Sequence, residues 1–416
     1  MTSSRDPVSS GARCTRRGFL DVVVRGGLAC AGANVFGCSR DTGAAATNAS
    51  PSASASAAAD ARETVRVGYL PITDAAPLLV AHGRGFFDAE GLAADRPVLL
   101  RSWPQIAEAF QARQIDVAHL LMPMTVWLRF SEHYPVKVVA WDHVDGSALT
   151  VTPSVQAVSD LAGRVVAVPF WYSIHNVILQ ELLRKNGLTP VLRGEPSLAK
   201  REVKLVVMAP PDMPPALASG AIAGYIVADP FNALAEIAGS GKILRFTGDV
   251  WQNHACCVVV LHEDDVRGRP AWSQKVVNAI ARAQLYAREN RDATATLLSK
   301  DGSGYLPQPK AAIARALAHY DAGEYAKSGA IQHPDGARAR IDFEPFPFAS
   351  YTEKLVALLK STRVEGDTAF LAELDPARVH AELVDDRFAR AAIQALGGPD
   401  RFGLPASLAR TERVSP

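Results

Sequence analysis

Residues 65–92 open with alternating apolar and polar positions and then change to a helical spacing. The first few residues predict a short buried strand that ends near Pro71. Thr73 or Asp74 then stands where a helix N-cap is expected. Free backbone N–H groups at such a helix start can bind an anion, although the first strand and helix of any α/β protein would give the same pattern.

The same succession of strands and helices recurs along the chain in two blocks. Strand patterns lie at residues 97–100, 115–121 and 136–141, and then at 165–168, 203–207 and 224–228. Two extended crossings, at 148–152 and 256–261, connect the blocks. We therefore predict an α/β protein with two lobes joined by a two-strand hinge.

The crossings also set the expected domain boundaries. The first lobe would consist of residues 64–149 and 255–404, the latter with a helical C-terminal region, and the second lobe of residues 150–254. The last residues, 405–416, read as a loose tail.

The N-terminus has the features of an export signal. Residues 15–20, TRRGFL, have the twin-arginine form, and a weakly apolar stretch then leads to the sequence VFGC, which ends at Cys38. We predict a signal peptide over 1–38 with lipidation of Cys38. The sequence that ends at Cys30 is a weaker candidate for the lipoprotein cleavage site. The alternative is a plain cytoplasmic N-terminal tail. A flexible linker follows over 39–63, so the body would lie at the outer face of the cytoplasmic membrane, lipid-anchored, or in the periplasm.

Composition narrows the class of protein. Of the 416 residues, 48% are hydrophobic and 21% are charged, and the net charge is +1, as in an ordinary soluble protein. That charge argues against a nucleic-acid surface, which needs a basic patch. No run of 18 apolar residues predicts a membrane span.

The body contains two adjacent cysteines, Cys256 and Cys257. Adjacent cysteines rarely pair with each other, so we expect no disulfide and interpret both as small buried apolar residues. Residues 262–265, HEDD, read as a solvated loop rather than a ligand set. We expect neither a metal nor a cofactor.

Loops that follow the predicted strands would face one another across a cleft between the lobes. Aromatic residues would line its walls and polar residues would supply hydrogen bonds. Ser173 would cap the helix that carries His175, and Asp229 could either bind ligand or cap its own helix. The predicted ligand-binding set is Tyr69, Thr73, Asp74, Trp103, Met124, Ser147, Trp171, Ser173, His175, Asp229, Gln252 and His254.

Several strings in these loops resemble the substrate-binding proteins of ABC importers, in the nitrate/bicarbonate/sulfonate/taurine branch. The strings are GYLPITDAAP at 68–77, GFFDAEGL at 85–92, MPM at 122–124, SIHN at 173–176, PPDM at 210–213, AGY at 223–225, DPFN at 229–232 and WQNH at 251–254. The resemblance implies a type II periplasmic-binding-protein fold, a small-molecule ligand, and a permease with its ATPase as partners. It also implies a monomer that binds its ligand by closure of the hinge.

Two positions depart from the nitrate-binding pattern. Ser147 stands where those proteins usually carry a glutamine, and Gln252 stands where they usually carry a lysine. Loss of a cationic donor removes a charge-assisted hydrogen bond. The ligand could therefore be a small anion or a small organic, nitrogen or sulfur compound, with His175 as a conditional source of positive charge.

Two rival functions remain on the same fold. One is an enzyme, either similar to pyrimidine-precursor synthases or a hydrolase that uses Ser173 and His175. These two residues lie two positions apart at one helix start, so their mutual hydrogen bonding would be poor. The other is a ligand-sensing partner of a membrane receptor. We expect a non-catalytic binding protein.

Overall fold

The computed structural model describes residues 63–320, 322–334 and 339–416. The predicted signal peptide, Cys38 and all but the end of the predicted linker lie outside these ranges. No helix within them is both long enough and apolar enough to cross a membrane. The described residues belong to one compact unit that contains two large sheets.

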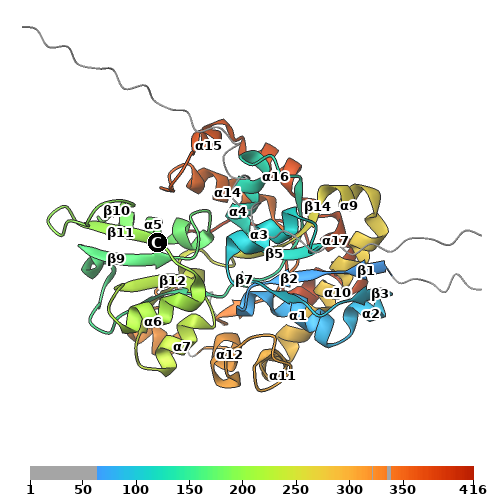
Figure 1. The fold of residues 1–416 in the computed structure, drawn as a ribbon, viewed down its shortest axis with the longest axis horizontal. Coiled ribbons are helices and arrows are strands. Elements are labelled where there is room, and N and C mark those ends of the chain that lie inside the picture. The colour runs from blue at the N-terminus through green and yellow to red at the C-terminus, as the bar shows by residue number, and fades with distance from the viewer. Residues whose placement is uncertain (1–62, 321, 335–338) are drawn as a thin grey trace, which may run out of the picture. The chain divides into compact units, whose positions relative to one another are not determined.

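The first large sheet has five strands in the order β4-β2-β5-β14-β6 (Figure 1). They are β2 (Val67–Tyr69), β4 (Val98–Leu99), β5 (Val117–Leu121), β6 (Val136–Trp141) and β14 (Cys257–His262). β14 returns from the second lobe and runs antiparallel to β5 and β6. Its run of valines is buried, as a strand covered on both faces requires.

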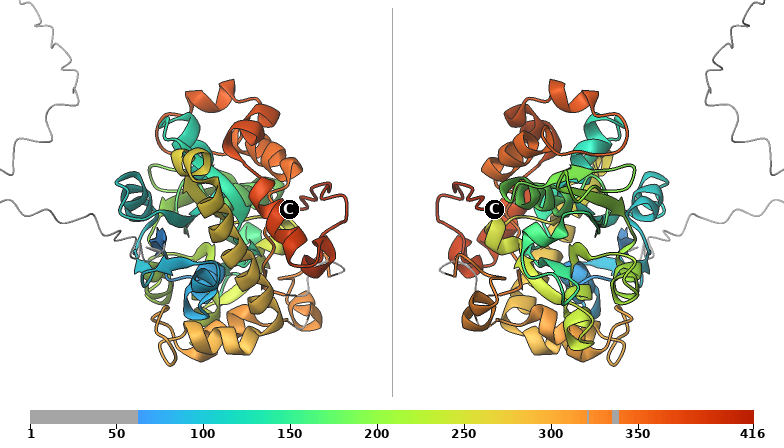
Figure 2. Two further views of the ribbon diagram at one scale, coloured as in Figure 1. Left: turned by 90° about the vertical axis from the view of Figure 1, so that its right-hand side faces the viewer. Right: turned by 90° about the vertical axis from the view of Figure 1, so that its left-hand side faces the viewer.

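Helices follow the strands of this sheet, with Pro near the start of several of them. They are α1 (Ala76–Gly83), α2 (Phe86–Ala89), α3 (Trp103–Gln111), α4 (Met122–Phe130), α9 (Glu263–Gly268) and α10 (Pro270–Glu289). A small sheet pairs β1 (Glu63–Val65) with β3 (Leu92–Ala94). Figure 2 shows the long α10 beside the C-terminal α17 (Arg387–Ala395), against which it packs.

The second large sheet has six strands in the order β10-β11-β9-β12-β8-β13. They are β8 (Ser147–Val151), β9 (Arg164–Val168), β10 (Thr189–Val191), β11 (Glu202–Val207), β12 (Gly224–Ala228) and β13 (Lys242–Phe246). The helices α5 (Ile174–Lys185), α6 (Met213–Ala218) and α7 (Phe231–Ile237) connect them (Figure 1). β8 comes directly from the first lobe and runs antiparallel to both of its neighbours.

Two crossing segments connect the sheets, but they do not lie at the predicted residues: 148–152 belong almost entirely to β8 and 256–261 to β14, which are strands of the two sheets. The outward crossing contains β7 (Val144–Asp145), and the return crossing contains α8 (Thr247–Val250). They run antiparallel at a bridge between Val144 and Ala255. A third segment, β15 (Ile341–Asp342), pairs with β7, so a later part of the chain also packs at the hinge.

The rest of the C-terminal region is helical, as expected. Its helices are α11 (Arg291–Leu298), α12 (Lys310–Leu317), α13 (Ala322–Lys327), α14 (Ala349–Leu359), α15 (Ala369–Glu373) and α16 (Pro376–Leu383). Tyr320 stacks on Phe246 of β13 with ring centroids 5.1 Å apart, and Tyr325 joins the same apolar cluster. This part of the C-terminal region therefore covers an edge of the second sheet.

Two sequence interpretations of polar segments are wrong. The C-terminal residues are anchored to the return crossing: the Ser415 amide donates to the Val250 carbonyl at 2.7 Å, and the Trp251 indole donates to Glu412 at 2.8 Å. The HEDD string is not a solvated loop, because His262 is buried and stacks on Phe110, with ring centroids 3.9 Å apart. Its acidic residues form the first turn of α9, where they suit the helix dipole.

Candidate functional site

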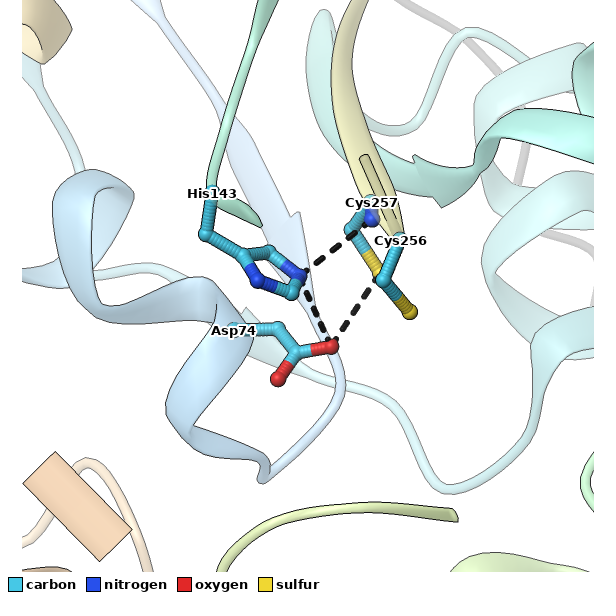
Figure 3. Close-up of side chains that lie close together, drawn as sticks. All are labelled: Asp74, His143, Cys256 and Cys257. Atoms are coloured by element: carbon cyan, nitrogen blue, oxygen red, sulfur yellow. Dashed lines mark hydrogen bonds and ion pairs between the residues drawn. The ribbon is translucent and has the colours of Figure 1, made fainter. Parts of the chain in front are cut away.

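Four polar side chains of the first lobe and its crossings meet in one buried cluster (Figure 3). Asp74 lies in the short 3₁₀ turn that precedes α1, and His143 follows β6. Cys256 and Cys257 stand where the return crossing enters β14. Each of the four side chains is completely buried.

Short distances connect these groups. Asp74 Oδ2 lies 2.9 Å from His143 Nε2, and the Cys257 thiol donates to the same carboxylate oxygen at 3.5 Å. The two cysteine sulfurs are 4.0 Å apart. The cysteines are thus buried, as predicted, but their neighbours are polar rather than apolar.

The second lobe contributes His175 and Ser147 to the same space. The Ser173 hydroxyl accepts a hydrogen bond from the Asn176 amide, and this cap fixes the first turn of α5. His175 Nε2 lies 2.9 Å from Ser147 Oγ and 3.8 Å from Cys256 Sγ. A continuous chain of polar groups therefore runs from the second sheet to the first; we call these six residues, Asp74, His143, Ser147, His175, Cys256 and Cys257, the interlobe cluster.

Burial and contacts between the groups both shift the pKa values in the cluster. Burial raises the pKa of Asp74 to about 6 and the pKa of Cys257 well above the ordinary thiol value. Burial alone would lower the pKa of His143, but the adjacent Asp74 carboxylate raises it well above its usual range. Burial would raise the pKa of Cys256, yet contacts with Cys257, His175 and His143 hold it well below the ordinary value.

A second layer of buried polar groups lies behind Asp74. His119 Nε2 accepts a hydrogen bond from the Leu70 amide at 2.9 Å, and its ring lies 5.6 Å from the ring of Trp103. Burial lowers the pKa of His119 to about 3 and raises that of Asp142 well above its usual range. His119 is therefore neutral at physiological pH.

Many buried polar atoms around the cluster have no hydrogen-bond partner among the described residues. They include Asp74 Oδ1, Trp103 Nε1, His119 Nδ1, both Asp142 carboxylate oxygens, His143 Nδ1 and His175 Nδ1. Buried polar groups in native proteins are normally satisfied, and such a concentration is typical of a place that receives a ligand, water or an ion.

The two lobes are in direct contact beside this cluster. The Asp229 carbonyl, after β12, accepts hydrogen bonds from Thr73, before α1. On the outer side Arg315 of α12 binds Glu236 of α7 through two hydrogen bonds of 3.0 Å. These hydrogen bonds hold the two lobes in contact in the described conformation.

The structure brings some of the predicted site residues together and separates others. Asp74, Ser147 and His175 belong to the interlobe cluster, Trp103 lies in the layer behind it, and Thr73 and Asp229 join the lobes. The others have structural contacts that account for their positions: the Tyr69 hydroxyl donates to the Tyr305 carbonyl, Met124 is in the apolar core, Ser173 caps α5, Trp171 is half-buried, and His254 lies 3.1 Å from Asp145. Gln252 lines a surface pocket of about 460 Å³ together with Arg410 and Arg413 of the C-terminal segment.

The site also contains residues that the sequence interpretation did not select. Asp142 and His143 directly follow a strand, and His119 interrupts the apolar string VAHLL of another strand. A polar residue at a strand end or inside an apolar strand was the available signal. Ser173 and His175 do not form the pair that a hydrolase would need: the Ser173 hydroxyl donates to the Phe170 carbonyl, and His175 contacts Ser147 instead.

Comparisons with known proteins agree with this architecture. The chain is 26% identical to the nitrate/nitrite binding protein NrtA of Nostoc sp. strain PCC 7120 over 351 residues, which is 77% of each chain. The periplasmic nitrate-binding protein NrtA from Synechocystis PCC 6803 matches with a TM-score of 0.68 and 20% identity, over 84% of this chain and 93% of that one. The alkanesulfonate-binding protein SsuA from Xanthomonas axonopodis pv. citri, bound to MOPS, matches with a TM-score of 0.55 and 16% identity, over 74% of this chain and 96% of that one.

These structural likenesses show that the fold is that of periplasmic binding proteins, as predicted. The model of the NMT1-like family matches residues 58–299, more than half of the sequence. The chain is a member of the NMT1-like family.

Proposed function

We propose that the protein is the extracytoplasmic solute-binding component of an ABC importer. It captures a small anion, or a small organic, nitrogen or sulfur compound, between its two lobes. The observation that carries this proposal is the interlobe cluster, in which buried polar groups from both lobes meet and several polar atoms have no partner among the described residues. A ligand that touches both lobes favours the closed state over an open one.

The names of the relatives support this class of function. The relatives described above bind nitrate, nitrite or alkanesulfonates according to their names, and none of those names describes an enzyme. By analogy we propose that this chain binds without catalysis and delivers its solute to a permease with its ATPase.

We propose a specific division of labour among the predicted residues. His175 and Ser147 supply hydrogen bonds from the second lobe, Asp74 supplies them from the first, and Trp103 shapes the wall. Thr73 and Asp229 hold the lobes closed around the solute. The remaining members of the predicted set, Tyr69, Met124, Trp171, Ser173, Gln252 and His254, would support these groups from outside.

The described residues include no lysine or arginine in the interlobe cluster. A small anion would therefore be bound mainly by neutral donors, which favours weaker binding or a ligand with apolar parts. We further propose that the protein is a monomer, exported by the twin-arginine route and anchored through Cys38.

Calorimetric titration of the full chain tests the proposal. The panel consists of nitrate, nitrite, bicarbonate, taurine and a short alkanesulfonate, and we expect saturable binding of one member at one site. His175→Gln should weaken that binding at least about tenfold, since it removes a buried hydrogen bond. His380→Gln is the matched control, because His380 is half-buried on α16 and contacts Thr352. Binding of no member, or equal binding by His175→Gln, would refute the proposal.

A further inference from the structure

Asp74, His143, Cys256 and Cys257 have the donor set of a metal site. Each offers one ligand atom, and these atoms all lie within 4.8 Å of one another. They come from three separate segments that meet at the carboxyl end of β2, the end of β6 and the start of β14 (Figure 3). The fold, rather than one flexible loop, holds them in position.

The position of the cysteines is unusual for neighbouring residues. In a regular strand adjacent side chains point to opposite faces. Cys256 precedes β14 and Cys257 begins it, so the backbone at this point need not obey that alternation. The two sulfurs lie 4.0 Å apart, and Cys257 Sγ contacts Asp74.

The separations of the donors are close to those of a tetrahedral centre. With Zn–S bonds of about 2.3 Å and Zn–N or Zn–O bonds of about 2.0–2.2 Å, donor atoms lie roughly 3.3–3.8 Å apart. Here the sulfur–sulfur distance is 4.0 Å, the sulfur–carboxylate distance is 3.5 Å and the carboxylate–imidazole distance is 2.9 Å. The widest separation in the set is no more than 4.8 Å, so shifts of up to about 1 Å would bring all four donors to one ion.

Charge also favours a cation at this place. His143 Nε2 faces the Asp74 carboxylate at 2.9 Å and the Cys257 amide at 3.2 Å. If the lone pair of His143 Nε2 accepts the hydrogen bond of the Cys257 amide, it also faces the lone pairs of the Asp74 carboxylate. The imidazole nitrogen and the carboxylate oxygen would then repel each other unless a proton or a metal cation lies between them. A divalent ion would compensate a buried carboxylate and two thiolates, whose isolated burial is expensive.

We propose that Asp74, His143, Cys256 and Cys257 bind one thiophilic divalent cation of the Zn²⁺ type. Sulfur, imidazole and carboxylate donors select such an ion over Ca²⁺ or Mg²⁺, which prefer sets made of oxygen atoms. Four protein ligands and complete burial make the coordination sphere closed, with no position left for substrate chemistry. The cation would be bound by Asp74 Oδ2, which already contacts His143 and Cys257, and Asp74 Oδ1, which has no partner among the described residues, would be left for the solute. This inference replaces the expectation of no metal.

The test uses the full chain with Cys14→Ser, Cys30→Ser and Cys38→Ser, so that Cys256 and Cys257 are its remaining cysteines. Zn²⁺ alone is titrated in competition with a chromophoric chelator, and the loaded protein is studied by X-ray absorption at the zinc edge. We expect one ion per chain, with two sulfur ligands at about 2.3 Å and two lighter ligands at about 2.0–2.2 Å. Cys257→Ser and the near-isosteric Asp74→Asn should each lower the affinity at least about tenfold.

His380→Gln again serves as the control and should bind Zn²⁺ like the parent. Circular dichroism and a melting curve establish that each variant is folded, and saturating Zn²⁺ should raise the melting temperature of the parent more than that of Cys257→Ser. Less than stoichiometric binding by the folded parent, a spectrum without sulfur ligands, or unchanged affinity in both variants would overturn the proposal. The calorimetric solute titration is independent, so either proposal can fail without the other.

Discussion

The carbonyl oxygen of Asp229 accepts two hydrogen bonds from Thr73, one from its amide and one from its hydroxyl, each at 2.9 Å. Thr73 belongs to the first lobe, and Asp229 ends a strand of the second. Their contact can form only when the lobes are together. It is therefore a direct measure of closure that does not require a solute to be identified.

Thr73→Val keeps the size and the amide of Thr73 but removes its hydroxyl. We expect the closed state to lose about 1 kcal/mol, which would lower solute affinity roughly fivefold. Thr125→Val is the control, because the Thr125 hydroxyl is buried but donates within α4, to the Met122 carbonyl. Calorimetry should show reduced affinity for Thr73→Val alone; an equal reduction in both variants would argue against closure through Thr73.

The ion pair between Arg315 and Glu236 should also stabilise closure. Arg315→Gln removes a bidentate interaction between the lobes, but the Arg315 side chain is 40% exposed, so solvent limits the effect to about 1 kcal/mol. We expect faster solute release in stopped-flow fluorescence. Arg113→Gln is the matched control, since Arg113 is 43% exposed and pairs with Asp265 inside the first lobe. Identical release rates in the two variants would contradict this role.

Arg410 anchors the C-terminal segment to the hinge. Its guanidinium lies 4.4 Å from the centre of the Phe348 ring, pairs with Glu412 at 2.8 Å, and donates to the Asn253 carbonyl at 2.9 Å. Arg410→Gln should reduce the free energy of unfolding by about 1–3 kcal/mol. Arg401→Gln, which removes an exposed pair with Glu289, should change it by less than about 1 kcal/mol in urea denaturation. Equal losses of unfolding free energy in the two variants would mean that Arg410 does not anchor the C-terminal segment.

Glu344 gives a pH dependence with a defined sign. Burial raises its pKa to about 8 from an ordinary value of 4.5, with Arg410 opposing the shift. The folded state then binds more protons than the unfolded state between about pH 4.5 and 8, so this group makes stability fall as pH rises through that window. In the parent this group should lower the free energy of unfolding by a few kcal/mol between pH 5 and pH 8, and Glu344→Gln should abolish that decrease. Urea denaturation at pH 5 and pH 8 checks this, with the exposed Glu353→Gln as control; parallel curves for both variants would exclude the effect.

Local patterns in the sequence predicted the elements that local interactions determine. The prediction of a strand before the loop that leads to α1 was correct, and Ser173 caps α5 as expected. The extended apolar runs at 148–152 and 256–261 were recognised as extended segments, but they form the sheet strands β8 and β14, and the crossings come before them. Family resemblance to the nitrate and sulfonate branch was confirmed by the comparisons.

Features that depend on distant parts of the chain could not be read in this way. Cys256 and Cys257 lie in an apolar string, and only the approach of Asp74 and His175 makes their surroundings polar. The C-terminal segment has no apolar periodicity, and it is ordered because Trp251 and other groups far away in sequence bind it. The lobe boundaries and the solute-binding residues stay predictions.

Solution X-ray scattering of the full chain, with and without the solute that binds in the titration, tests the central claim most directly. If two lobes close around a solute at the interlobe cluster, the radius of gyration should decrease on binding, and Thr73→Val should need more solute to reach the same value. A radius of gyration that is unchanged at saturating solute would contradict capture between the lobes.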